Sequence, residues 1–137
     1  MSPSLTLAAR AALTRQFEKT WQEYEQFVYS LARRRRYRLP PPTRLHQMVG
    51  AHGYVDTAKR LMQASGATQT GFTDLWLFGD AIGQDLISKY SIEALMLEER
   101  FRPLFTNDER AEAQRRIDEI NEAPGQRRPS ALGAGVK

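Results

Sequence analysis

The run from Leu5 to Leu39 limits the fold more than any other part of the chain, because it contains neither glycine nor proline. Within this run, large apolar residues recur at intervals of three or four, which places them on one side of a helix. They are Leu13, Phe17, Trp21, Tyr24, Val28 and Leu31. We therefore predict a helix from Ser4 to about Arg36, roughly 45 Å long at about 1.5 Å per residue.

The aromatic side of this helix has two interpretations. It packs against the rest of the same chain, or part of it pairs with a second copy or a partner protein. The second interpretation arises because a chain of 137 residues has little surface with which to cover so long a helix. Trp76 and Glu93 lie further along the chain and also have two interpretations. They are either required for folding or form part of a partner-binding groove. The residues predicted for a protein interface are Phe17, Trp21, Tyr24, Val28, Trp76 and Glu93.

A concentrated positive charge follows at the end of the predicted helix. Residues 32–42 read ARRRRYRLPPP, with five arginines within six positions. Residues 1–45 carry nine Lys and Arg against three acidic residues, whereas the rest of the chain is slightly acidic. Pro40, Pro41 and Pro42 stop the helix and impose an extended connector. The basic excess therefore belongs to one end of the molecule.

Three roles are open for these arginines. They complement the negative C-terminal end of the helix dipole, bind the phosphates of a nucleic acid or another polyanion, or contact an acidic protein. Dipole complementation seldom needs five guanidinium groups, and their mutual repulsion is relieved by a polyanion. Tyr37 could stack on an unpaired base, and Arg44 extends the patch if the prolines fold the chain back. The residues predicted for this surface are Arg33, Arg34, Arg35, Arg36, Tyr37, Arg38 and Arg44.

The remainder of the chain reads as short helices separated by capping and breaking residues. Helix starts are indicated at Thr43, Thr73 and Ser91, and Thr106 with Glu109 forms a capping-box pattern. No stretch shows the period-two alternation of a strand. We predict an all-α protein of five to seven helices. A long N-terminal helix (1–39) packs on a compact helical domain (40–122), and a disordered tail (123–137) follows.

Two later segments, GAHGYVDTAKRLMQASGATQTGFTDLWLFG and SIEALMLEERFRPLFTNDERAEAQRRI, carry a distinctive set of motifs. The set, GFxxLWxxG, then [ST][VI]EALxL, then LFTxxExxxAxxR[LI], resembles a small helical domain that recurs in uncharacterised bacterial proteins. It covers about residues 50–117, although the link DAIGQDLISKY is longer than in that pattern. The resemblance implies a bacterial or phage origin and a compact helical unit, and no chemistry. The matching residues are Gly71, Phe72, Leu75, Trp76, Gly79, Ser91, Ile92, Glu93, Ala94, Leu95, Leu97, Leu104, Phe105, Thr106, Glu109, Ala113, Arg116 and Ile117.

No motif for catalysis or metal binding stands out. His46 and His52 are six positions apart, which places them on different sides of a continuous helix. The best acid–base candidates are Asp74, Asp80 and Asp85, which lie in the least charged region. There is no phosphate-binding loop, no nucleophile elbow and no good match to a helix-turn-helix. We expect no catalytic residues, no metal site and no cofactor.

The absence of cysteine and of a long apolar run favours a cytoplasmic protein without a membrane span. The N-terminal residues lack the basic and apolar regions of a signal peptide. We predict a non-enzymatic bacterial adaptor or accessory protein that acts through protein contact, with its arginine-rich helix end on nucleic acid or an acidic surface. The alternative is a nucleic-acid-binding small subunit of a ribonucleoprotein or DNA-associated complex.

Overall fold

The computed structural model describes residues 5–63 and 70–122, which form seven α-helices and one 3₁₀-helix and contain no strand. The predicted all-α fold is confirmed, whereas the predicted tail 123–137 lies outside the described residues. The helices are α1 (Leu7–Arg34), α2 (Thr43–His52), α3 (Tyr54–Gln63), α4 (Thr70–Ile82), α5 (Ile87–Tyr90), α6 (Ile92–Met96), the 3₁₀-helix η1 (Glu99–Leu104) and α7 (Asn107–Glu122).

The long N-terminal helix is present and has defined ends. Thr6 precedes α1, and its hydroxyl accepts a hydrogen bond from the backbone N–H of Ala9 at 3.0 Å. The helix runs for 28 residues, or about 42 Å. It ends at Arg34, slightly before the predicted end at Arg36.

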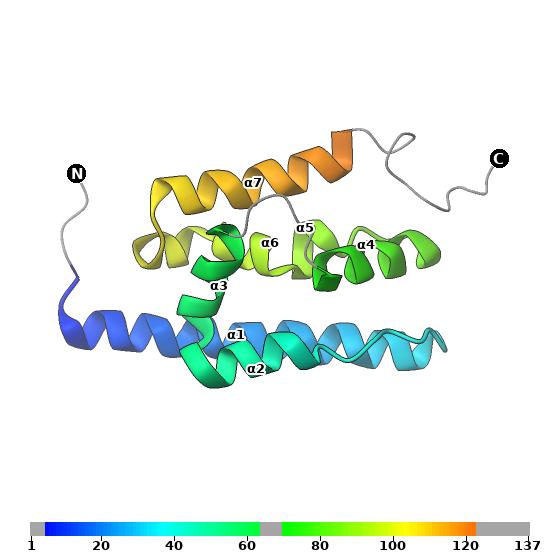
Figure 1. The fold of residues 1–137 in the computed structure, drawn as a ribbon, viewed down its shortest axis with the longest axis horizontal. Coiled ribbons are helices and arrows are strands. Elements are labelled where there is room, and N and C mark those ends of the chain that lie inside the picture. Colours follow the sequence, from blue (N-terminus) through cyan, green and yellow to red (C-terminus); the bar gives the residue numbers. More distant parts are fainter. Residues whose placement is uncertain (1–4, 64–69, 123–137) are drawn as a thin grey trace.

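The helices are arranged in three levels (Figure 1). The chain leaves α1, turns back and runs alongside it into α2, so that these two helices form one level. The helices α4, α5 and α6 form a middle level, and α7 lies over them. The short α3 crosses between the levels and contacts both α1 and α7.

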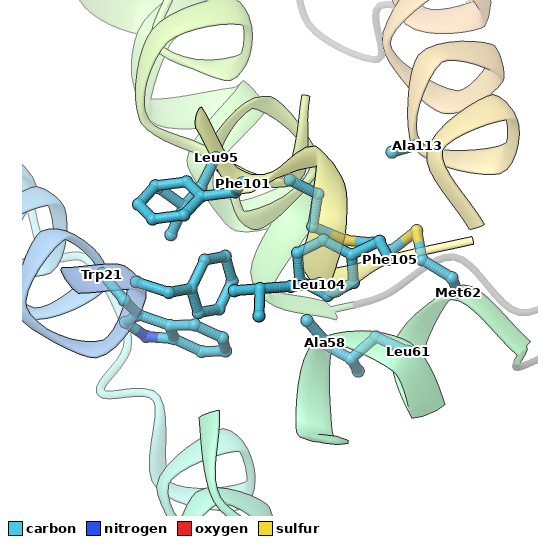
Figure 2. Packing of buried hydrophobic residues seen from close by; sticks show 11 residues of the cluster. Trp21, Ala58, Leu61, Met62, Leu95, Phe101, Leu104, Phe105 and Ala113 are labelled. Carbon is cyan, nitrogen blue, oxygen red and sulfur yellow. The ribbon is translucent and has the colours of Figure 1, made fainter. Parts of the chain in front are cut away.

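The main core joins the N-terminal half of α1 to residues late in the chain. Phe17 is fully buried, and its ring lies 5.2 Å from that of Phe101 and 5.3 Å from that of Phe105. Figure 2 shows Trp21 of α1 at one side of this cluster, which also contains residues of α3, α6, η1 and α7. Because burying a large aromatic side chain contributes about 1.5–3 kcal/mol, this cluster holds α1 on the rest of the domain.

A second cluster lies toward the C-terminal end of α1. Val28, Leu31 and Ala32 pack there against Phe78 of α4 and Leu86 of the α4–α5 turn. The cluster continues the apolar stripe predicted for the first helix. Both ends of that stripe are therefore covered by the same chain.

The predicted capping residues are right at Ser91 and Thr106, whereas Thr43 and Thr73 do not cap their helices. Ser91 accepts a hydrogen bond from the N–H of Ala94 at 3.0 Å, as a cap of α6. Thr106 and Glu109 exchange the two hydrogen bonds of a capping box, at 3.1 and 2.9 Å. Thr43, by contrast, is the first residue of α2 rather than its cap, and Thr73 lies inside α4.

From the sequence, the glycines at 79 and 83 predict that the chain loosens between them, but α4 continues through Gly79 to Ile82. The chain then turns sharply at Gly83, which has a φ of 71°. The N–H of Gln84 donates to the carbonyl of Gly79 at 2.9 Å. The turn thus folds directly onto Gly79 before α5 begins.

Candidate functional site

The arginine run lies at a well-defined helix end. The N–H of Tyr37 donates to the carbonyl of Ala32 at 2.9 Å, and the N–H of Arg36 donates to the carbonyl of Arg33 at 3.1 Å. This pair of bonds is a Schellman motif, which reverses the chain after a helix. It places Arg36 in the left-handed region with a φ of 56°. Arg33 and Arg34 thus belong to the last helical turn, and Arg35 to Arg38 to the reversal.

Five arginines at this helix end are all exposed. We call them the arginine cluster: Arg33, Arg34, Arg35, Arg36 and Arg38. Within the described residues, none of them forms an ion pair with a carboxylate. Among the residues that the structure describes, their side chains make one hydrogen bond, from Arg33 to the hydroxyl of Ser30 at 3.1 Å. Their charge is therefore offset by the helix dipole and by solvent rather than by acidic side chains.

Tyr37 has a packing role that the sequence did not indicate. Its ring lies 4.6 Å from that of Phe78, at an angle of 34°, and belongs to the second core cluster. One face of the ring is therefore engaged within the protein and is not open to a stacked base. The tyrosine instead anchors the reversal, and with it the arginine cluster, to α4.

The prolines fold the chain back, which is the condition under which Arg44 was expected to extend the patch. The hydroxyl of Tyr29 donates to the carbonyl of Pro40, and His46 lies 2.8 Å from Glu25. Arg44 lies between Pro40 and His46, in the segment that runs back along α1, and it is exposed. Measured along the axis of α1, Arg44 therefore lies roughly 6–12 Å from Arg33, at about 1.5 Å per residue. Arg44 is thus a neighbour of the arginine cluster rather than a member of it.

Five of the six residues predicted for a protein interface are buried. The exposed fractions of Phe17, Trp21 and Val28 are 0%, 3% and 5%, and those of Trp76 and Glu93 are 8% and 3%. In this conformation these side chains present almost no surface to a protein partner. The other interpretation, packing within one chain, describes what the structure contains.

Tyr24, the remaining residue predicted for the interface, is partly buried and bonded internally. Its hydroxyl donates to a carboxylate oxygen of Glu98. Burial, followed by the hydrogen bond to Glu98, raises the pKa of Tyr24 to about 12. The phenol therefore stays protonated and links α1 to the segment before η1.

Glu93 is a buried carboxyl held by a basic partner. Arg116 of α7 lies 3.6 Å from it and also contacts Glu112 at 2.7 Å. Burial raises the pKa of Glu93, and Arg116 acts in the opposite direction. The pair joins α6 to α7.

The titratable residues considered for chemistry are dispersed or internally paired. In the described ranges, no group of three His, Cys, Asp or Glu residues could hold a metal ion. Asp85 accepts a hydrogen bond from the N–H of Ser88, in the first turn of α5. The cations of α3 are also paired, Lys59 with Glu109 and Arg60 with Asp56, each at 2.8 Å. Both of these α3 cations are therefore already engaged by carboxylates within the protein.

A pocket of about 390 Å³ was missed by the sequence analysis. It lies among α1, the proline connector, α2, α4 and the segment from Tyr90 to Leu95. Its walls come from parts of the chain that are far apart in sequence, so no local motif signals it. The nearest signal was the acidic residue Asp74 in an apolar segment.

Comparisons with known proteins found no match among family models, curated proteins or solved structures. The resemblance of residues 50–117 to a bacterial helical domain therefore stays a prediction. None of the helices within 5–63 and 70–122 combines the length and the apolar character needed to cross a membrane.

Proposed function

We propose that this protein is a non-enzymatic helical accessory protein that binds nucleic acid through the phosphate backbone, using the arginine cluster. The observation that carries the proposal is the exposure of five arginines that have no carboxylate partner in the described part of the chain. Arginine is suited to this role because its planar guanidinium binds a phosphate through two hydrogen bonds.

The rigid placement of the charge supports the proposal. The Schellman turn and the contact of Tyr37 with Phe78 fix the backbone on which the arginines stand. Bringing like charges together costs free energy, which the release of counterions from a nucleic acid offsets. With Tyr37 packed inside, contact with phosphates is favoured over stacking on bases.

An adaptor role through the aromatic side of α1 is a weaker proposal, because that side is buried in the core. An acidic protein as partner of the arginine cluster is the competing outcome of the same experiment. Both partners would be attracted by charge, and they differ in how strongly their binding depends on salt.

The test compares two double variants that remove the same charge from opposite ends of α1. One carries Arg34→Gln and Arg35→Gln, and the control carries Arg15→Gln and Lys19→Gln, which are also exposed. Binding of labelled single- and double-stranded oligonucleotides is measured by fluorescence anisotropy between about 50 and about 200 mM salt. Each lost phosphate contact reduces the slope of log K against log salt by about 0.9 for duplex DNA.

We expect the Arg34/Arg35 variant to lose about 2 units of slope and the control to keep the wild-type slope. Equal weakening in both variants would show that binding follows net charge rather than the arginine cluster. Weak binding that is the same in all three proteins would overturn the proposal. Preferential binding of polyglutamate, lost only in the Arg34/Arg35 variant, would identify an acidic protein as the partner instead.

A further inference from the structure

The pocket of about 390 Å³ is of the size that binds small organic molecules. Trp21, Tyr24 and Val28 of α1 form one wall, and Leu45 and Met48 of α2 form another. Phe72 and Leu75 of α4 face them, with Tyr90 alongside. Most of the lining is therefore aromatic or aliphatic, and it can enclose an apolar body.

Three acidic side chains and one basic side chain line the same pocket, and two of the acidic ones have a partner within the protein. Glu25 is paired with His46 at 2.8 Å, and Glu93 is paired with Arg116 at 3.6 Å. Arg44 has no acidic partner among the described residues, but it is exposed at the edge, where solvent screens its charge.

Asp74 is the fourth, and it differs from the other three. Its side chain is partly buried, lines the pocket and forms no hydrogen bond or ion pair within the described residues. A carboxylate against apolar walls is poorly solvated, so it gains more from a bound cation than an exposed carboxylate does.

The charge of Asp74 also affects the pKa of a neighbouring tyrosine, Tyr29. Burial raises the pKa of Tyr29 to about 12, followed by the negative charges of Glu25 and Asp74. Tyr29 also lines the pocket, and its hydroxyl is already bonded to Pro40. The hydroxyl of Tyr29 is therefore not available to donate a hydrogen bond to Asp74.

We propose that this pocket binds a small organic cation, an amine with an aromatic or aliphatic body, whose ammonium group pairs with Asp74. Aromatic side chains add to the attraction, because a cation near their faces interacts favourably with the ring electrons. The apolar body of the ligand fills the space between α1, α2 and α4. This site is separate from the arginine cluster and does not depend on the proposed binding of nucleic acid.

The test uses three probes that share one apolar body and differ in charge: phenylbutylamine, phenylbutanol and phenylbutyrate. Binding to the full chain is measured by chemical-shift perturbation of the backbone amides. We expect the amine to bind about tenfold more tightly than the alcohol, and the shifts to map to α1, α2 and α4. Asp74→Asn should remove this tenfold preference and leave binding of the alcohol unchanged. The control Asp108→Asn, at an exposed residue outside the pocket, should retain the preference.

Thermal melting of each variant confirms that the fold is retained. Equal affinity of the amine and the alcohol in the wild type would overturn the proposal. So would tighter binding of phenylbutyrate that is lost in Arg44→Gln, because the pocket would then take an anion. Absence of shifts with all three probes at millimolar concentration would show that the pocket is not a site for compounds of this kind.

Discussion

Arg36 combines two properties that rarely occur together, a bulky side chain and a left-handed backbone. Its φ of 56° is the one positive value for a non-glycine residue in the described ranges. This conformation crowds the Cβ atom and costs an L-residue about 1–2 kcal/mol. Glycine is the usual residue at this position of a Schellman motif. The arginine therefore reduces stability at the place where it adds charge.

We predict that Arg36→Gly stabilises the protein by about 0.5–1 kcal/mol, because glycine adopts the left-handed conformation without crowding. The control is Arg35→Gly, which removes the same charge from a residue with a φ of −89°. That change should be neutral or destabilising. The measurement is urea unfolding followed by circular dichroism, and an equal gain in both variants would assign the effect to charge rather than to the backbone.

Tyr37 shows what sequence reasoning misses at the scale of a residue. A tyrosine among arginines suggests a stacking platform, and a tyrosine after a helix end can equally be the apolar residue that closes a Schellman motif. The choice depends on Phe78, a distant residue that packs on the ring. Local sequence contains no information about that contact.

The helices differ in how well their ends could be predicted. The caps at Ser91 and at Thr106 with Glu109 were predicted correctly, because both ends of each hydrogen bond lie within three residues. The continuation of α4 through Gly79 was missed, because it depends on a turn that comes later in the chain. A Cβ atom at Gly79 would lie 2.6 Å from the carbonyl oxygen of Gln84. Glycine is thus required there by close approach and not by a break in the helix.

We predict that Gly79→Ala and Gly50→Ala have opposite effects on stability. At Gly79 the added methyl group must displace backbone, which costs about 1–3 kcal/mol. Gly50 lies inside α2 with no atom within 4 Å of the added Cβ, so alanine should stabilise the helix by about 0.5 kcal/mol. Thermal unfolding of both variants checks this, and a destabilised Gly50→Ala would contradict the packing described for α2.

At the scale of the molecule, one chain covers the aromatic stripe that was open to two interpretations. The long first helix and the all-α fold were predictable, because the period of the apolar residues is a local property. Which surface covers the stripe was not, because Phe17 meets Phe101 and Phe105 from the other end of the chain. The arginine cluster could be found in the sequence, whereas the pocket could not, because its walls meet only after folding.

We predict that the protein is a monomer of 15.7 kDa in solution. The large apolar side chains exposed in the described residues are Leu7 and Phe27, and Phe27 is stacked on Tyr90. These do not form the contiguous apolar surface that a stable dimer needs. Size-exclusion chromatography with light scattering measures the mass at high concentration. A dimer that dissociates in the Leu7→Ser variant would contradict the prediction.

A contact between residues far apart in the sequence also has a consequence for the synthesis of the chain. The guanidinium of Arg100 donates to the hydroxyl of Thr20, and 80 residues separate the two. At about 5–20 residues per second, a ribosome needs about 4–16 s to make the intervening chain. For that interval Phe17 lacks the rings of Phe101 and Phe105 that pack on it in the finished protein, so this part of the nascent helix stays incompletely covered.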